Sequence, residues 1–349
     1  MTSLTKLRKA DILEPEIRYV RTVDLSKFKA YVDAINSSLA ALYHQDSPLF
    51  SVVKGTLLGV GKRIRPVLSL LSCEAVSGDY RAALPIATAY ELAHNASLVQ
   101  DDIIDRAEKR RDSSTVYAEY GLNTAILVSD MLIFEIFTRI GEYQKHDLPR
   151  RRLYMLLNLI GEASKATTVG EYMDEDLARK DNVYEEEYVE MVRNKTGAML
   201  GALAACGAVV GGGSLRQVHA LYRFGEKHGI AYQIQDDVLD IMSNEELMGK
   251  PVFNDIRNRR KNLVLIHAMR SVSNKEKELI RRLYGRQSFP SHEIRRLRAI
   301  LTDSGSIDYA RNMALAMAAD GRAQLRKLRP SIARDKLEEL SYAIMRGVA

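Results

Sequence analysis

The most constraining feature of this chain is an apolar periodicity of three and four residues that runs through nearly its whole length. Leu68, Leu71 and Ala75 illustrate the spacing, which puts apolar side chains on one face of a helix. No segment alternates apolar and polar residues over the length of a strand, and the 349 residues include only 8 prolines. The pattern therefore predicts an all-α protein.

Short segments rich in glycine, serine, aspartate and proline divide the chain into about a dozen expected helices of roughly 12 to 30 residues. The breaks fall at 44–48, 77–79, 111–114, 147–149, 211–214, 243–251, 288–291 and 303–306. A chain of this length could form two domains, but no Ser/Pro/Gly-rich linker separates two halves. We therefore expect a single all-α domain over residues 25–349, preceded by an N-terminal arm over residues 1–24.

Composition excludes several classes of protein. Hydrophobic residues make up 46% of the chain and charged residues 28%, which is typical of a soluble globular protein and not of a disordered one. The first 24 residues carry charges of both signs and no apolar segment, so no signal peptide is expected. Cys73 and Cys206 are too few for a disulfide scaffold and fit buried thiols in the cytoplasm.

One uncharged stretch, Thr196–Leu215, could imitate a transmembrane segment. Six of its 20 residues are glycine and five are alanine, and three consecutive glycines interrupt it at 211–213. Such a stretch is only weakly apolar. We expect a buried helix that permits close packing, and no transmembrane segment.

Positive charge is concentrated in the last quarter of the chain. The net charge is +6, and residues 271–349 contain 16 Lys and Arg against 9 Asp and Glu. These charges follow helical spacing, as in Arg295–Arg298, and no nucleic-acid-binding motif accompanies them. We expect a solvated helix face and no nucleic-acid partner.

Two acidic motifs carry the chemistry. Residues 100–105 and 235–240 share the pattern Gln-Asp-Asp-apolar-apolar-Asp, and each ends a long segment with helical spacing, 82–105 and 217–241. On a helix, the first and last aspartates of each motif lie four residues apart on one face and repel each other. A hard divalent cation such as Mg²⁺, which takes oxygen ligands and binds substrate phosphates, resolves this repulsion.

Cationic residues occur near both motifs. They are Lys62, Arg63, Arg65, Arg110, Arg111, Lys195 and Lys250, with the hydroxyl of Thr196 beside Lys195. Arginine offers forked donors to a phosphate and lysine offers a point charge. Together with the carboxylates, they predict a diphosphate bound by metal ions on one side and by cations on the other.

In this order the motifs resemble those of the trans-isoprenyl diphosphate synthases, the polyprenyl synthetase family. The resemblance covers residues 61–263 and continues more weakly to the end. Its elements are Gly61–Pro66, His94 before Ala96–Leu98, Asp101–Asp105, Arg110-Arg111, Lys195-Thr196, Tyr232-Gln233, Asp236–Asp240 and Gly249–Pro251. The resemblance implies a large helical bundle around a central cavity. It also implies a Mg²⁺-dependent prenyltransferase that condenses isopentenyl diphosphate head to tail with an allylic diphosphate.

The resemblance further implies roles for individual residues. Isopentenyl diphosphate is expected to bind Lys62, Arg65, His94 and Arg111. The allylic diphosphate is expected to bind Arg110, Lys195, Thr196, Gln233 and Lys250, with Arg260 at the position of a family lysine. Three Mg²⁺ ions per active site are expected on Asp101, Asp105 and Asp236, with Asp240 as a further candidate ligand and Asp102 and Asp237 in support. The expected catalytic set is Asp101, Asp102, Asp105, Lys195 and Asp236.

These residue types suit the ionisation of an allylic diphosphate. Metal ions and cations stabilise the departing diphosphate. The Thr196 hydroxyl and the Gln233 carbonyl are expected beside the allylic cation, and the released diphosphate can take the proton. No Ser/His/Asp or Cys/His arrangement is visible, and this chemistry does not need one.

The chain departs from the family pattern at several positions, none of them a metal ligand. Val60, Gln100, Asp112 and Glu171 stand where the family usually has glycine, histidine, glycine and glutamine. The usual lysine and threonine near residue 261 are replaced by Arg260 and Asn262, with Lys261 between them. The sequence leaves open whether Arg260 or Lys261 takes the place of the lysine.

Product length in this family depends on residues that precede the first motif along an apolar tunnel. The positions four and five before Asp101 hold Ser97 and Ala96, which are small, whereas bulky residues there stop elongation early. Ala93 and Ala89, further along the same face, are also small. Tyr90 is the first large side chain expected to form a floor, about 16 Å below Asp101 along a helix. We expect a geranylgeranyl or longer product.

Two other functions fit part of the sequence. The main alternative is a non-catalytic regulatory subunit of a heteromeric synthase, although such subunits typically lose aspartates that this chain keeps. A terpene cyclase has the same helical architecture but usually lacks the cationic cluster at 61–66 and the second acidic motif. The resemblance also implies a homodimer.

Overall fold

The computed structural model describes residues 25–43, 47–59, 63–110, 113–146, 148–242, 253–286 and 288–345. Nearly all of these residues are helical, which confirms the predicted fold class. The exception is a hairpin of two antiparallel strands, β1 (Lys109–Arg110) and β2 (Ser113–Ser114). The N-terminal arm expected over residues 1–24 lies outside the described residues.

The helices follow one another with short connections. The first half of the chain forms η2 (Leu25–Phe28), α2 (Lys29–Ala40), α3 (Pro48–Leu58), α4 (Ile64–Ser77), η3 (Arg81–Ala83), α5 (Leu84–Ile104), α6 (Val116–Gly141), η4 (Glu142–His146) and α7 (Arg150–Arg179). The second half forms α8 (Glu185–Val192), η5 (Arg193–Gly197), α9 (Ala198–Val210), α10 (Leu215–Met242), α12 (Asn254–Arg257), α13 (Leu263–Ser271), α14 (Asn274–Leu283), α15 (Ser291–Asp303), α16 (Ser306–Gln324), η6 (Leu325–Lys327) and α17 (Ile332–Met345).

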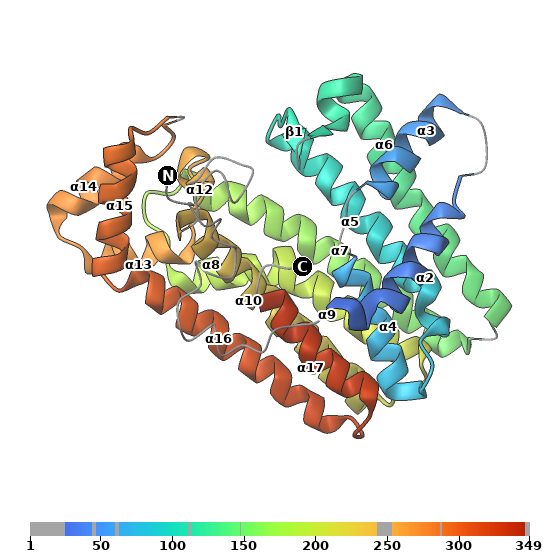
Figure 1. Ribbon diagram of the computed structural model, residues 1–349. Coiled ribbons are helices and arrows are strands. Elements are labelled where there is room, and N and C mark those ends of the chain that lie inside the picture. The colour runs from blue at the N-terminus through green and yellow to red at the C-terminus, as the bar shows by residue number, and fades with distance from the viewer. Residues whose placement is uncertain are drawn as a thin grey trace, which may run out of the picture.

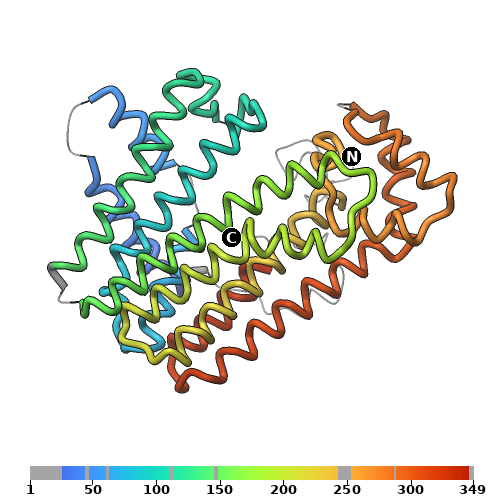
Figure 2. Tube along the Cα trace, turned by 180° about the vertical axis from the view of Figure 1, so that it is seen from behind, coloured from blue at the N-terminus to red at the C-terminus, as the bar shows by residue number. Residues whose placement is uncertain are grey.

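Three helices, α7, α9 and α10, run side by side through the middle of the molecule (Figure 1). Helices α2 to α6 lie at one end, and α8 with α12 to α15 lie at the other. Helices α16 and α17 pack along α10. Figure 2 shows the same arrangement from behind, with α7 reaching from one end group to the other.

Two hydrophobic clusters fill the interior, and α10 contributes to both. Val218 and Phe224 from its first half belong to the cluster formed with α2 to α6. Ile230 and Val238 from its second half belong to the cluster formed with α8 and α12 to α16. The long central helices therefore join the two ends of the molecule through their own buried faces.

Helix α9 is a buried helix of small residues, as the composition of Thr196–Leu215 predicted. All of its residues except Met199 are buried. A Cβ added at Gly207 would lie 2.2 Å from the Ser69 carbonyl oxygen of α4, and one at Gly225 would lie 2.2 Å from the Leu200 carbonyl oxygen. Glycine is therefore required where α9 crosses α4 and α10.

Several of the large apolar side chains that are exposed lie on α6. They include Leu122, Ile126, Leu127, Phe134 and Phe137, all between 45% and 64% exposed. Within the described residues, Val116–Gln144 is the one segment long and apolar enough to cross a membrane, with a mean hydropathy of 1.4. The uncharged stretch Thr196–Leu215, for which a buried helix was expected, is a different segment, and its α9 portion is buried.

A buried ion pair fixes the start of α4 against α5. Arg63 adopts a left-handed backbone conformation (φ 54°), which is strained for a residue with a side chain. Its guanidinium donates to Glu91 Oε1 and to the Leu57 carbonyl, each at 2.5 Å, and to Asn36 Oδ1 at 3.1 Å. Arg63 thus points inward, away from the substrate role that its cationic neighbourhood suggested, and holds the backbone that leads to Arg65.

We expect Gly207→Ala to lower the free energy of unfolding by about 1–3 kcal/mol or more, because the new methyl group overlaps the α4 backbone. Gly161→Ala in α7 is the matched control, since a Cβ there meets nothing within 4 Å. It should raise stability by about 0.5–1 kcal/mol, because alanine favours the helix. Urea denaturation of both variants checks this, and equal effects would contradict the close crossing.

We expect Arg63→Met to destabilise the protein by about 3–5 kcal/mol, because it leaves the Glu91 carboxylate buried without a counter-charge. The double variant Arg63→Met/Glu91→Met removes both charges and should recover most of that loss. Denaturation curves of the wild type, the single variant and the double variant provide the measurement. A double variant as unstable as the single one would show that the ion pair is not the source of the effect.

Candidate active site

Both acidic motifs lie at the C-terminal ends of long helices, as predicted. Asp101 and Asp102 are in the last turn of α5, and Asp105 is its C-cap residue. Asp236 and Asp240 lie in the last two turns of α10. The C-terminal end of a helix carries a partial negative charge, so carboxylates there need nearby cations or hydrogen-bond donors to stabilise them.

Within each motif, the three aspartates have different surroundings. The first ones, Asp101 and Asp236, are partly exposed, and neither carboxylate forms a hydrogen bond or ion pair with another described residue. Asp102 is buried and accepts a hydrogen bond from Arg110 Nε at 2.8 Å. Asp237 is buried and accepts from the Tyr188 hydroxyl at 2.5 Å. The first aspartates are thus the ones left available to a metal ion.

The last aspartates of the two motifs also differ. Asp105 is exposed and is paired with Arg260, whose Nη2 lies 3.0 Å from its Oδ1. Asp240 is buried, and its two carboxylate oxygens accept the backbone N–H groups of Asn254 and Asp255 at 3.0 and 3.1 Å. Asp240 therefore caps the N-terminus of α12. This arrangement does not support its predicted role as a metal ligand.

The turn between α12 and α13 resolves the ambiguity at the family lysine. Arg260 points to the acids, because its guanidinium reaches Asp105 and lies 3.8 Å from Asp174. Lys261 points elsewhere, with its Nζ 3.9 Å from the centre of the Tyr284 ring. Asn262 accepts the Leu265 N–H and so caps α13, a role for which asparagine is well suited.

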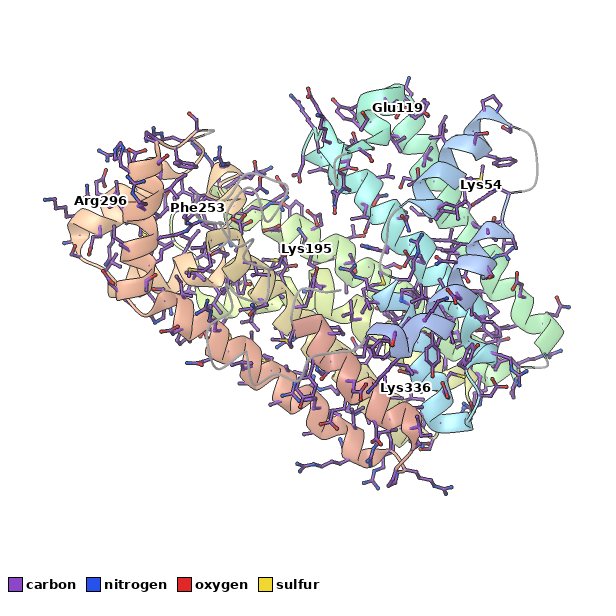
Figure 3. All side chains as sticks on the ribbon, viewed as in Figure 1. Lys54, Glu119, Lys195, Phe253, Arg296 and Lys336 are labelled. Carbon is purple, nitrogen blue, oxygen red and sulfur yellow. The ribbon has the colours of Figure 1, made fainter. Side chains whose placement is uncertain are left out.

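Lys195 is held by two acids of α7. Its Nζ lies 2.8 Å from Glu171 Oε2 and 2.7 Å from Asp174 Oδ2. It belongs to η5, a single π-helical turn, which is a feature often found at functional sites. A Cβ at Gly170 would lie 2.3 Å from the Lys195 backbone nitrogen, so glycine lets η5 approach α7. Figure 3 shows Lys195 near the middle of the molecule.

Carboxylates outnumber cations among the described residues of this region. Asp101, Asp105, Glu171, Asp174 and Asp236 gather near three basic side chains, those of Lys195, Arg260 and Arg110. Burial, together with the charge of Glu171, raises the pKa of Asp101 to about 6. Burial alone would lower the pKa of Lys195, but the charges of Asp174 and Glu171 raise it. Further cations are therefore needed to neutralise the excess negative charge of these carboxylates.

The donor chemistry fits a hard divalent cation. The side chains available to bind a metal ion at this site are all carboxylates. Among the described ranges, no group of three or more His, Cys, Asp or Glu converges on one point. Magnesium ions are usually held in this way, by one or two carboxylates with water and substrate phosphate completing the shell.

A second group of predicted residues lies between α4, α5 and α10. Arg65 Nη1 lies 3.1 Å from His94 Nε2, and the Arg65 guanidinium carbon lies 5.5 Å from the centre of the Tyr232 ring. The structure therefore brings Arg65 and His94 together, as the resemblance implied. Lys62, Arg111 and Lys250, which were predicted to bind diphosphate, lie outside the described residues.

The residues predicted to set product length lie along α5 below the first motif. Ala96 and Tyr90 are buried, and the Tyr90 hydroxyl lies 3.9 Å from Cys206 Sγ in α9. Ser97 is partly exposed, and its hydroxyl donates to the His94 carbonyl at 2.9 Å. Both cysteines are buried free thiols, as expected. Burial raises the pKa of Cys73 to about 11 and that of Cys206 to about 12.

Sequence reasoning missed three contributors to the site. Asp174 received no role, although its spacing of three residues from Glu171 puts both on the same face of α7. Asp240 caps a helix that begins 14 residues later, and no local sequence pattern predicts this contact. Tyr188 carries no motif, and only the fold brings it to Asp237.

Comparison with known proteins identifies the family of the chain. Residues 48–301 match the polyprenyl synthetase family model. The chain is 35% identical over 315 residues to a geranylgeranyl pyrophosphate synthase of Geoglobus acetivorans, covering 89% of this chain and 96% of the relative.

Solved structures share the fold over nearly the whole chain. A geranylgeranyl pyrophosphate synthetase from Pyrococcus horikoshii superposes with a TM-score of 0.85 at 35% identity, covering 92% of this chain and 97% of that one. A polyprenyl synthase from Caulobacter crescentus, solved with calcium and isoprenyl diphosphate, gives a TM-score of 0.83 at 26% identity, covering 93% and 98%. Enzymes of this family use a divalent metal. The chain belongs to the polyprenyl synthetase family and is a trans-prenyltransferase that elongates isoprenoid chains.

Proposed function

We propose that this enzyme condenses isopentenyl diphosphate with an allylic diphosphate in a reaction that requires Mg²⁺, three ions per site, and that it makes geranylgeranyl diphosphate or a longer product. The observation that carries the proposal is the pair of partly exposed aspartates, Asp101 and Asp236, at the ends of two helices, with Lys195 and Arg260 beside the same cluster. The similarity to two archaeal geranylgeranyl synthases supports the product class.

In this proposal, different residues bind the metal ions, the two diphosphates and the allylic cation. Asp101, Asp105 and Asp236 hold the metal ions, which neutralise charge on the departing diphosphate when bound. Lys195, Arg110 and Arg260 are ion-paired to acids in this structure and can transfer their donors to the allylic diphosphate. Arg65 and His94 bind isopentenyl diphosphate. The oxygens of Thr196 and Gln233 face the allylic cation, and the leaving diphosphate takes the proton.

Three wider features belong to the same proposal. Residues 25–349 form a single domain, because α7 and α10 run through both hydrophobic clusters. The enzyme acts in the cytoplasm, where its two buried thiols stay reduced. Tyr90 forms the floor that ends chain growth, since it is a large buried side chain on α5 below the small residues Ala96 and Ser97.

A product assay by mass spectrometry tests the reaction. Purified protein receives isopentenyl diphosphate, Mg²⁺ and one primer at a time: dimethylallyl, geranyl, farnesyl or geranylgeranyl diphosphate. We expect elongation to a product of 20 carbons or more, and EDTA should abolish it because the acids alone cannot neutralise the diphosphate. Tyr90→Ala should lengthen the longest product.

Other outcomes of this assay are equally informative. A folded, metal-supplied chain that extends no primer would favour the regulatory-subunit alternative, and a partner chain would then be needed. An unchanged product distribution in Tyr90→Ala would exclude Tyr90 as the floor. Activity that survives EDTA would contradict the role given to the acidic motifs.

We also propose that the enzyme is a homodimer joined through α6. Phe134 and Phe137 are 64% and 61% exposed, and they lie on the same helix as Leu122, Ile126 and Leu127. A contiguous apolar surface of this kind is costly in water and marks an interface. A second copy of the same face is a complementary occupant in a two-fold dimer.

Sedimentation analysis of three proteins tests the interface. The wild type should be a dimer, and Phe134→Glu/Phe137→Glu should be a monomer, because two buried charges oppose association. Ile332→Glu is the matched control, since Ile332 is 75% exposed on α17 and should leave the dimer intact. A monomeric wild type, or a double variant that stays dimeric, would contradict the proposal.

A further inference from the structure

Three consecutive hydrogen bonds join a buried tyrosine to the oxygens that we place beside the allylic cation. The Tyr188 hydroxyl donates to Asp237 Oδ2 at 2.5 Å, and Gln233 Nε2 donates to Asp237 Oδ1 at 3.1 Å. The Thr196 hydroxyl donates to Gln233 Oε1 at 3.2 Å. Each donor in the series therefore has an acceptor, and the order is Tyr188, Asp237, Gln233 and Thr196.

Tyr188 has no direct access to a substrate. It lies on α8, is 1% exposed, and belongs to the hydrophobic cluster at the α8 end of the molecule. Helix α8 packs against η5, which carries Thr196, and against α10, which carries Gln233. The tyrosine thus connects the two elements that present the cation-facing oxygens, and any effect it has on the reaction must act through them.

The second aspartate of the motif decides how the Gln233 side chain is turned. A glutamine amide has a donor end and an acceptor end that can exchange places by rotation. Asp237 Oδ1 accepts from Gln233 Nε2, and this bond selects the orientation in which Nε2 faces Asp237. The carbonyl oxygen Oε1 then faces Thr196. In the opposite orientation, the N–H dipole would face the allylic carbon and repel a developing positive charge.

Tyr188 is needed because Asp237 has two oxygens. The hydroxyl bond occupies Oδ2, so the carboxylate plane is fixed and Oδ1 stays aligned with Gln233. Without this donor, a buried carboxylate oxygen would be left unsatisfied, which is costly. The carboxylate would then rotate toward another donor, and the Gln233 amide would lose the constraint on its orientation.

We propose that Tyr188 is a positioning residue of the condensation reaction, which acts through Asp237 to keep the Gln233 carbonyl turned toward the allylic cation. This inference rests on the proposed function, because it takes the allylic cation to form beside Thr196 and Gln233. It gives Asp237 an orienting role in the second acidic motif, distinct from metal binding by Asp236.

The test is Tyr188→Phe, which removes the hydroxyl and keeps the ring that packs in the core. We expect kcat to fall about tenfold, while KM for each substrate changes less than about twofold, because the substrate-binding cations are untouched. A larger fraction of the allylic diphosphate should end as allylic alcohol. In that side reaction the allylic C–O bond breaks, water oxygen forms the new C–O bond, and its proton goes to diphosphate.

Tyr143→Phe is the matched control. Tyr143 is also buried, but its hydroxyl donates to the Ala82 carbonyl and accepts from the Ile86 N–H, which are both backbone groups far from Gln233 in the sequence. Both variants lose a buried hydrogen bond and should lose similar stability. Only Tyr188→Phe should change kcat and the yield of alcohol.

Introducing Tyr188→Phe into a second variant distinguishes a role of Tyr188 in orienting Gln233 from a general effect on the structure. In Gln233→Leu, which has no amide to orient, Tyr188→Phe should cause no further loss of kcat. Asp237→Asn, which can donate as well as accept, should lower kcat in the same way, and adding Tyr188→Phe should change little. This variant also provides the test if Tyr188→Phe folds poorly.

Several results would overturn the inference. They are a Tyr188→Phe enzyme that matches Tyr143→Phe in kcat and alcohol yield, and an equal loss of kcat from Tyr188→Phe in the wild-type and Gln233→Leu backgrounds. Either result, in an active wild-type enzyme, rejects the inference and leaves the proposed function intact. A wild type that extends no primer rejects the proposed function and this inference with it.

Discussion

Repulsion among the carboxylates at the ends of α5 and α10 is the electrostatic cost that the active site has to offset. Like charges four residues apart on a helix cost a few tenths of a kcal/mol, and the partial negative charge of a helix C-terminus adds about 0.3–1 kcal/mol per group. Burial then raises the pKa of Asp101 to about 6. The fold tolerates this cost because cations from three other elements reach the same region: Arg110 of the hairpin, Lys195 of η5 and Arg260 beyond α12.

Close backbone packing keeps those elements in place. Helix α9 consists mainly of alanine, glycine and valine, and glycine allows it to touch α4 and α10 at Gly207 and Gly225. Another glycine, Gly170, lets the π turn that carries Lys195 rest on α7. Glycine at these crossings removes the space in which the helices could shift, so the positions of the charged side chains follow from backbone contacts.

The sequence predicted the features that depend on local pattern. Helical periodicity gave the fold class and the two long helices that end in acidic motifs, and small-residue composition predicted the burial of α9. Features that depend on contacts between residues distant in the sequence were not predicted. Arg63 has the same sequence signature as the substrate-binding cations, yet a left-handed backbone turns it toward Glu91. Asp240 repeats the spacing of Asp105, yet it caps a helix that begins 14 residues later.

The pairings of the cations explain how one site can hold its charges in two states. Without a ligand, Arg110 neutralises Asp102, Arg260 neutralises Asp105, and Lys195 lies between Glu171 and Asp174. These same cations are the ones expected to hold the allylic diphosphate. We propose that a metal–diphosphate complex would exchange one set of ion pairs for another: metal ions would bind the carboxylates of the motifs, and the diphosphate would accept from the guanidinium and ammonium groups. These three cations would then keep a charged partner in both states, which limits the desolvation cost of leaving a buried cation unpaired.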